Sequence, residues 1–174
     1  MLGAVKVGTD SLEPIIVQMS EKYGVPTALI KATIKQESNW NVSASRFEAH
    51  KTDASWGLMQ ILLATAKETL GNNELSITQL LNPSINIEAG TKFLAKQLAR
   101  YKGNMMDAIA AYNAGSAKKD ENGIYINNAY VQAVYGNYVM YKTLESVASP
   151  AAAVSVGLAA IIGVGLVLAT RGLS

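Results

Sequence analysis

Hydrophobic residues recur every three to four positions along most of the chain, which is the spacing of an amphipathic helix. The first such stretch predicts a helix over residues 11–23, with Pro14 in its first turn and Gly24 after its end. A second helix is predicted over residues 27–38, with Thr27 as a candidate capping residue. Residues 39–55 are polar and have no sustained period, so we predict a loop that is long enough to be functional.

The same spacing predicts further helices over residues 58–70, 83–101, 104–113 and 129–145. Ser76 and Gln79 have the spacing of a capping box, and Asn82-Pro83 is typical of a helix start. Residues 116–128 are polar and predicted to form a loop. No pair of strands with a clear alternating pattern is found. The fold class predicted for this part of the chain is therefore mostly α.

Residues 151–170 contain no charged residue, and as a helix they match the hydrocarbon thickness of a bilayer. We predict a single-pass transmembrane helix at the C-terminus; a buried core helix is the alternative. Ala153 with Gly157, and Ala159 with Gly163, would let this helix approach a second copy or other membrane proteins. The predicted organisation is a tail (1–10), a helical domain (11–146), a linker (147–150) and the membrane helix (151–170).

Charge and composition narrow the chemistry. The formal net charge of +2 is too balanced for the basic footprint of a nucleic-acid-binding domain, so no nucleic acid is expected as a partner. The absence of cysteine excludes disulfides and thiolate chemistry, and the single histidine, His50, cannot form a multi-histidine metal site. We expect no metal and no cofactor. Carboxylates then remain as the main candidates for acid–base chemistry.

Glu37 is the strongest candidate among them. Ile30, Ile34 and Glu37 are spaced so that they share one helix face, which places a carboxyl group among buried isoleucines. Burial disfavours the charged form of a carboxyl group, so this position suits a general acid. The alternative is a glutamate at a helix end that reaches solvent.

Four segments follow one another in an order that resembles a known family: IKQESNWNVSA, SWGLMQILLATA, NPSINIEAGTKFLA and AIAAYNAG. The sequence resembles the catalytic domain of the soluble lytic transglycosylases, which are related to goose-type lysozyme. The resemblance covers about residues 15–141. It implies a lysozyme-like helical domain and an enzyme that acts on peptidoglycan.

The resemblance also assigns roles to individual residues. It places Glu37 at the catalytic acid and Ser38 directly after it as a substrate-binding residue. It also implies that Met59 and Gln60 line the saccharide groove. It implies that Asn86, Ile87 and Gly90 pack beneath the site. Substrate contacts are further implied for Tyr112, beside the catalytic glutamate, for Asn113, and for Tyr130 in the last helix. Met59 has a plainer alternative as core filler.

The chain departs from the family's pattern at Ala64, where a proline is common, and in two places that bear on the substrate. Residues 126–129 stand where many members carry a Glu-Thr pair, so a second acidic contact is missing. The segment 43–55 is longer than usual and carries several charged residues, Arg46 among them. Both departures affect how the substrate would be held.

The implied activity is cleavage of the glycan strands of peptidoglycan between N-acetylmuramic acid and N-acetylglucosamine, with a 1,6-anhydro product and a single acid. A lysozyme-type hydrolase on the same fold, a non-catalytic membrane-anchored wall-binding protein and a membrane-active protein are the alternatives. Residues 1–9 lack the features of a secretory signal. We therefore expect a phage virion-associated member in a virion membrane, with the bacterial inner membrane as the alternative location.

Overall fold

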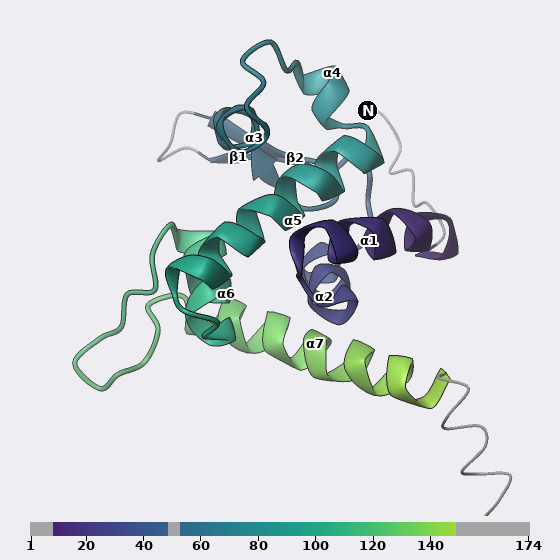
Figure 1. The fold of residues 1–174 in the computed structure, drawn as a ribbon. Coiled ribbons are helices and arrows are strands. Elements are labelled where there is room, and N and C mark those ends of the chain that lie inside the picture. Colours follow the sequence, from purple (N-terminus) through teal and green to yellow (C-terminus); the bar gives the residue numbers. More distant parts are fainter. Residues whose placement is uncertain (1–8, 49–52, 149–174) are drawn as a thin grey trace, which may run out of the picture.

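The computed structural model describes residues 9–48 and 53–148, and helices dominate this part of the chain (Figure 1). A small sheet lies between the second and third helices in the sequence. In chain order the elements are α1 (Thr9–Tyr23), α2 (Thr27–Ser38), β1 (Ser45–Glu48), β2 (Asp53–Trp56), β3 (Ile61–Leu62), α3 (Leu63–Leu70), α4 (Ile77–Leu80), α5 (Pro83–Arg100), α6 (Met105–Ala114) and α7 (Asn128–Ala148).

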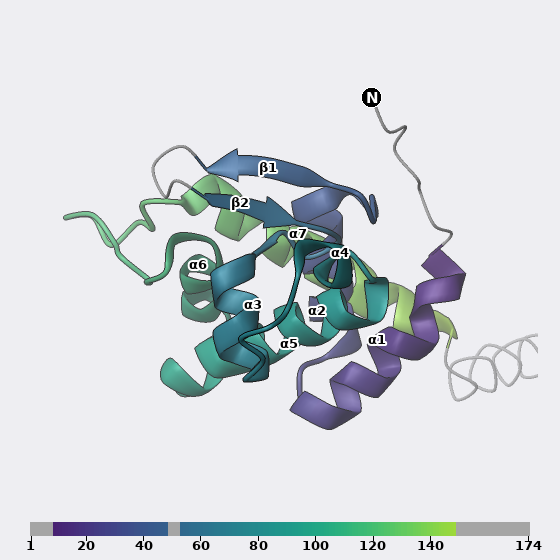
Figure 2. The ribbon, with the colours of Figure 1, turned by 90° about the horizontal axis from the view of Figure 1, so that it is seen from above.

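Helix α5 lies between two apolar clusters. The larger one joins α1, α2, α5, α6 and α7, and its fully buried members include Ile34, Ile87 and Leu94. The smaller one lies under α3 and α4 and contains Leu80 and Ala89. Figures 1 and 2 show α5 crossing the middle of the molecule. Because α5 contributes to both clusters, it fixes the sheet and α3 relative to the α2–α7 pair.

The structure confirms most of the predicted helix limits. Ser76 and Gln79 form the reciprocal hydrogen bonds of a capping box, and the Asn82 side chain accepts from the Ser84 N–H one residue after Pro83. The prediction for Thr27 is wrong. Its side chain does not cap α2 but donates a hydrogen bond to Glu145 Oε1 at 2.9 Å, because α7 lies directly beside this end of α2.

The prediction of a loop over residues 39–55, and of no strand pairing, is also wrong. β1 and β2 form an antiparallel hairpin, and β3 pairs with β2 in a sheet of order β1-β2-β3. The strands are only four, four and two residues long, and sequences such as SRFE and DASW do not alternate between apolar and polar residues. Such short strands give too little periodicity to be recognised.

The transmembrane part of the predicted fold class is corrected. Within residues 9–48 and 53–148, no helix is both long enough and apolar enough to cross a bilayer. α7 has 21 residues, but polar side chains such as Lys142 and Glu145 interrupt it. The segment predicted to span the membrane, 151–170, lies outside the described residues. The fold class described is therefore a mostly helical domain with a small sheet.

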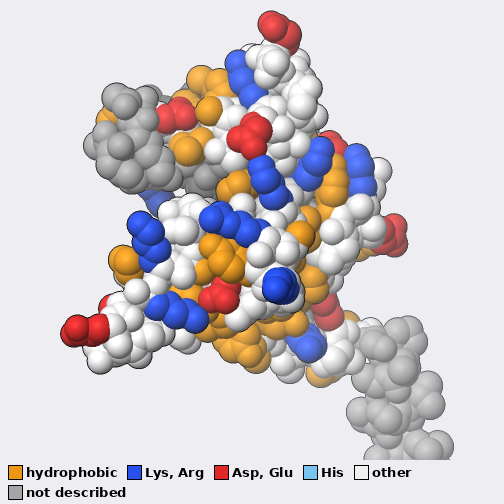
Figure 3. Space-filling model, turned by 60° about the vertical axis from the view of Figure 1, so that its left-hand side comes forward, with side chains coloured by type: hydrophobic (Ala, Val, Ile, Leu, Met, Phe, Trp, Pro, Cys, Tyr) orange, Lys and Arg blue, Asp and Glu red, His pale blue; other side chains and the backbone are white. Residues whose placement is uncertain are grey.

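Figure 3 shows one face of the surface, where basic side chains are spread among apolar and polar ones. They do not merge into one continuous basic area on this face. A ligand on this face would therefore meet single basic side chains and not an extended basic surface.

Candidate active site

Glu37 lies in the last turn of α2 and is buried, with 9 % of its surface exposed. Ile30 and Ile34 on the same face are fully buried, which confirms that the carboxyl group shares the core-facing side of the helix. Asn39 and Trp40 then adopt left-handed backbone conformations, with φ of 49° and 67°. These two residues end the helix abruptly, so Glu37 stands at the point where the chain turns away.

Tyr130, near the start of α7, donates a hydrogen bond from its hydroxyl to Glu37 Oε1 at 2.6 Å. The pKa of Tyr130 lies well above its usual value, first because of burial and then because of the neighbouring Glu37 charge. The hydroxyl therefore stays protonated at neutral pH. It holds one oxygen of the Glu37 carboxyl group in a fixed position.

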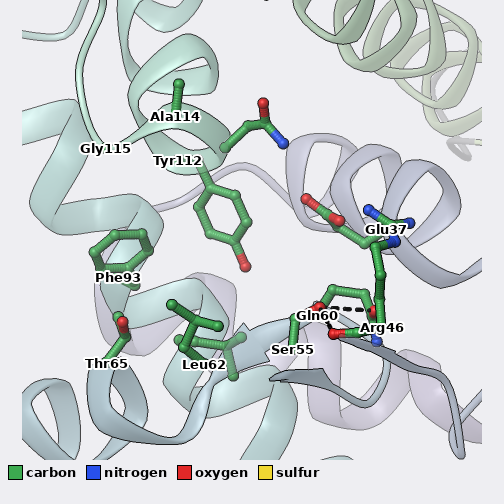
Figure 4. A pocket seen from close by; sticks show the side chains of 12 residues that line it. Glu37, Arg46, Ser55, Gln60, Leu62, Thr65, Phe93, Tyr112, Ala114 and Gly115 are labelled. Atoms are coloured by element: carbon green, nitrogen blue, oxygen red, sulfur yellow. Dashed lines mark hydrogen bonds between the residues drawn. The ribbon is translucent and has the colours of Figure 1, made fainter. Parts of the chain in front are cut away.

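Tyr112, in α6, approaches from the opposite side (Figure 4). Its hydroxyl donates to the carbonyl oxygen of Met59 at 2.9 Å, and its ring packs against Phe93 with centroids 5.3 Å apart. Burial, and then the charge of Glu37, raise the pKa of Tyr112 well above its usual value. A neutral phenol thus faces the Glu37 carboxyl group across the pocket.

A pocket of about 520 Å³ opens between these groups. This size falls within the range of small-molecule and sugar-sized sites. A second pocket adjoins the first, and the two share Glu37, Arg46 and Gln60 as lining residues. The first is lined by Glu37, Arg46, Ser55, Gln60, Ile61, Leu62, Thr65, Phe93, Tyr112, Asn113, Ala114 and Gly115. An extended ligand that filled both would contact Glu37.

The turn over residues 57–60 is held from below by Asn86 of α5. The Asn86 side chain accepts from the Met59 N–H at 2.8 Å and donates to the carbonyls of Trp56 and Leu80 at 2.9 and 3.0 Å. Asn86 is fully buried, so these bonds satisfy an amide that would be costly to leave unpaired. A Cβ at Gly57 would lie 2.3 Å from its Nδ2 atom, so only glycine fits there.

Met59 is fully buried and is not among the residues that line either pocket. Its side chain packs against α5, where a Cβ at Gly90 would lie 2.4 Å from the sulfur. In this structure the side chain is a packing residue. Met59 contributes to the site through its carbonyl oxygen, which positions Tyr112.

Gln60 lines both pockets and connects the turn to the hairpin. Its Nε2 donates to the carbonyls of Ala44 and Gly57 at 3.0 and 2.9 Å, and its Oε1 accepts from the Ser55 hydroxyl at 3.0 Å. Its own backbone is left-handed, with φ of 44°. The amide is thus committed to holding the floor of the groove in place.

The remaining predicted residues lie around the same groove. Ser38 lines the second pocket, and its hydroxyl donates to the carbonyl of Ile34 at 3.2 Å. Asn113 lines the first pocket and is exposed, and its Oδ1 accepts from Asn127 Nδ2 at 2.9 Å. Asn127 thereby leaves the Asn113 NH₂ group as a donor that can serve a ligand.

Sequence reasoning assigned no individual role to most of the residues that line the first pocket, among them Ser55, Arg46 and Phe93. Ser55 and Arg46 fell in the predicted loop, and only the strand register shows that they face each other across the hairpin. Phe93 falls within the helix predicted over residues 83–101, and the structure shows that it lines the pocket. In the part of the chain that the structure describes, no group of three or more histidine, aspartate or glutamate residues is placed to hold a metal.

Comparison with known families shows to which family the chain belongs. Residues 14–132 match the family described as Transglycosylase SLT domain, which covers more than half of the chain. The chain belongs to this family. The prediction from the four sequence segments is therefore confirmed, and Glu37, Gln60, Asn86 and Tyr112 all fall inside the SLT domain.

Two of three curated relatives of this SLT domain protein described below carry names that refer to transglycosylases. It is 33 % identical to a membrane-bound lytic murein transglycosylase C of Yersinia enterocolitica, over 59 % of this chain and 31 % of the relative. It is 35 % identical to the soluble lytic murein transglycosylase of Escherichia coli K12, over 54 % of this chain and 14 % of the relative. Protein IpgF of Shigella flexneri is 30 % identical, over 63 % of this chain and 72 % of its own length. The chain thus spans less than a third of the first two.

Solved structures support the lysozyme-like fold of the SLT domain. An inactive mutant of lytic transglycosylase Slt from Pseudomonas aeruginosa aligns with a TM-score of 0.67 and 26 % identity, over 82 % of this chain and 25 % of that one. The 70 kDa soluble lytic transglycosylase of Escherichia coli aligns with a TM-score of 0.53 and 27 % identity, over 73 % of this chain and 18 % of that one.

Proposed function

We propose that this SLT domain protein is a peptidoglycan lytic transglycosylase that cleaves the β-1,4 bond between N-acetylmuramic acid and N-acetylglucosamine. Membership of the family and the names of its relatives support this activity. The observation that carries it is the buried Glu37 at the junction of two pockets. A glycan strand lying in both would present a glycosidic bond to that carboxyl group.

In the first step, Glu37 protonates the glycosidic oxygen, and the bond from that oxygen to C1 of the muramic acid breaks. The substrate's own N-acetyl group supplies its carbonyl oxygen to C1 and stabilises the positive charge that develops there. Common glycosidases use a second carboxylate for this task. Among the described residues that line the two pockets, Glu37 is the only carboxylate, which supports a scheme with a single acid.

In the second step, the ionised Glu37 accepts the proton of the muramic 6-hydroxyl as that oxygen attacks C1. The C1–O6 bond forms as the bond from the N-acetyl oxygen breaks, and Glu37 regains its proton. No water is consumed, and the product carries a 1,6-anhydro ring. The Tyr130 hydroxyl would hold the carboxyl group in place through both proton transfers, because it remains protonated itself.

Product analysis tests this proposal. Purified peptidoglycan is digested with the wild-type protein and with Glu37→Gln, and the fragments are identified by mass spectrometry. We expect 1,6-anhydro ends from the wild type and a loss of activity of at least about a hundredfold in the variant. Reducing ends would instead show a lysozyme-type hydrolase. Binding to peptidoglycan without any fragment would show a wall-binding protein.

The setting in a phage particle remains a prediction from the sequence alone. The curated relatives named above are bacterial proteins. Mass spectrometry of purified virions tests the setting, because a protein found in host membranes and never in virions would contradict it.

A further inference from the structure

Arg46 occupies a position in the groove that the catalytic scheme does not use. In the register of the hairpin it pairs with Ser55, and Ser55 lines the first pocket. Arg46 and Ser55 therefore share the groove face of the two strands, whereas Phe47 and Ala54 belong to the opposite face. In Figure 4 the Arg46 side chain rises from the hairpin beside Glu37.

The backbone around Arg46 is fixed on both sides of the hairpin. The Ser55 hydroxyl donates to Gln60 Oε1 at 3.0 Å and lies 3.4 Å from the Arg46 carbonyl oxygen, its alternative acceptor. Two residues before Arg46, the Ala44 carbonyl accepts from Gln60 Nε2 and from the Gly57 N–H. A cation carried on this braced strand has a defined position relative to Glu37.

Arg46 is also the only cation among the described residues that line the two pockets, and it lines both. It forms none of the ion pairs found among the described residues, and its side chain is exposed. The positive charge nevertheless acts on the site. It lowers the pKa of Tyr130, although burial and the charge of Glu37 have larger effects and raise that pKa overall. The guanidinium group is thus presented to whatever fills the groove.

We propose that Arg46 is a specificity residue that binds a carboxylate of the glycan substrate next to the bond that is cleaved. This inference rests on the proposed function. The sugar rings of peptidoglycan are neutral, and carboxylates occur on the lactyl group of muramic acid when it is unsubstituted and on the peptide stem when it is attached. A guanidinium group binds a carboxylate through two parallel hydrogen bonds. Arg46 would therefore favour muramic acid over plain N-acetylglucosamine in the adjoining subsite.

The experiment measures binding by calorimetry in the Glu37→Gln background, so that no substrate is consumed. Arg46→Gln removes the charge, Arg46→Lys retains it without the bidentate geometry, and Lys142→Gln on α7 is the control for net charge. Each is titrated with three soluble ligands: glycan strands with peptide stems, strands without stems, and chitooligosaccharides, which carry no carboxylate.

We expect Arg46→Gln to weaken binding of carboxylate-bearing strands by about tenfold or more and to leave chitooligosaccharide binding unchanged. A loss confined to stem-free strands assigns the lactyl carboxylate, and a loss confined to stemmed strands assigns the peptide. Arg46→Lys should recover part of the affinity, and Lys142→Gln should match the parent. An equal loss on all three ligands, or no loss on any, would overturn the proposal.

The same strands are digested with the protein that retains Glu37. Absence of 1,6-anhydro products together with Arg46-dependent binding would refute the transglycosylase function alone. Normal products together with carboxylate-independent binding would refute the role of Arg46 alone.

Discussion

Tyr130 and Glu37 are 93 residues apart in the sequence, and the tyrosine hydroxyl lies 2.6 Å from the carboxyl oxygen. The contact joins the last turn of α2 to the start of α7, and these two helices pack along each other. Other contacts hold this pair of helices together, among them the hydrogen bond from Trp40 Nε1 to the Tyr141 hydroxyl at 3.3 Å. The position of the proposed acid therefore depends on the packing of α7.

Replacing Tyr130 by phenylalanine removes this hydrogen bond and keeps the ring. We expect kcat/KM on peptidoglycan to fall by about tenfold or more, because the Glu37 carboxyl group is then no longer held in the geometry that proton transfer requires. The melting temperature should change little, since the ring still fills its place. Tyr135→Phe, at an exposed position of the same helix, is the control and should keep wild-type activity. Equal activity of Tyr130→Phe and the wild type would contradict a positioning role.

The pH profile provides a second test of the two tyrosines. Burial and the charge of Glu37 raise the pKa values of Tyr112 and Tyr130 well above the usual value of 10.0, so both phenols stay protonated as the pH rises toward that value. Between about pH 9 and 10 the activities of the wild type and of Tyr130→Phe should therefore change with pH in the same way. A titration step in this range that disappears in the variant would show that Tyr130 ionises more readily than its surroundings imply.

Gly90 and Gly136 allow a matched test of packing, because both lie within helices and differ in what a Cβ would meet. At Gly90 the Cβ would lie 2.4 Å from the Met59 sulfur and 2.6 Å from its Cβ, whereas nothing lies within 4 Å at Gly136. We expect Gly90→Ala to destabilise the protein by about 1–3 kcal/mol through overpacking. Gly136→Ala should stabilise it by about 0.5–1 kcal/mol, since alanine suits a helix better. Urea unfolding measures the stability of both variants. Changes of the same sign in the two unfolding free energies would contradict the close packing of Gly90 against Met59.

Gly57 and Gly103 form a second pair, in which both residues have left-handed backbones, with φ of 74° and 82°. A Cβ at Gly57 would meet the Asn86 amide at 2.3 Å, and one at Gly103 would meet nothing within 4 Å. Alanine at either position is destabilised by about 1–2 kcal/mol, because an L-residue with a side chain is strained in the left-handed conformation. Only Gly57→Ala should lower the unfolding free energy by more than this strain. It should also reduce activity, because Asn86 holds the turn that contains Met59, and the Met59 carbonyl positions Tyr112. Equal unfolding free energies for the two variants would contradict the role of Asn86.

Most of the fold could be predicted because its helices are long and periodic. Ile30, Ile34 and Glu37 share a face by spacing alone, and the structure buries all three. The hairpin could not be predicted, since β1 and β2 are short and are joined by pairings such as Arg46 with Ser55 that no local pattern specifies. Gln60 shows the same limit at the site: its family position marked it as important, but its bonds to Ala44 and Ser55 depend on the hairpin.

The last prediction concerns Lys31, which joins three helices. Its ammonium group lies 2.8 Å from Glu13 of α1 and 2.9 Å from Glu145 of α7, and only 12 % of its side chain is exposed. Burial lowers the pKa of Lys31, but hydrogen bonds and charge from the two glutamates outweigh this effect, and the net pKa is raised. Lys31→Met keeps the apolar stem and removes the charge. Because the two carboxylates are partly exposed and screened by water, we expect a loss of about 1–2 kcal/mol at neutral pH.

The sign of the pH dependence follows from the raised pKa. A lysine whose folded-state pKa exceeds the unfolded value of 10.5 contributes its full stability below that pH, and the contribution is lost as the pH rises through the folded-state pKa. The difference in unfolding free energy between the wild type and Lys31→Met should therefore be constant at neutral pH and shrink above about 10.5. Lys22→Met, which removes the exposed pair with Glu88, is the control and should shift the urea midpoint less. A larger shift for Lys22→Met would show that Lys31 does not hold the three helices together.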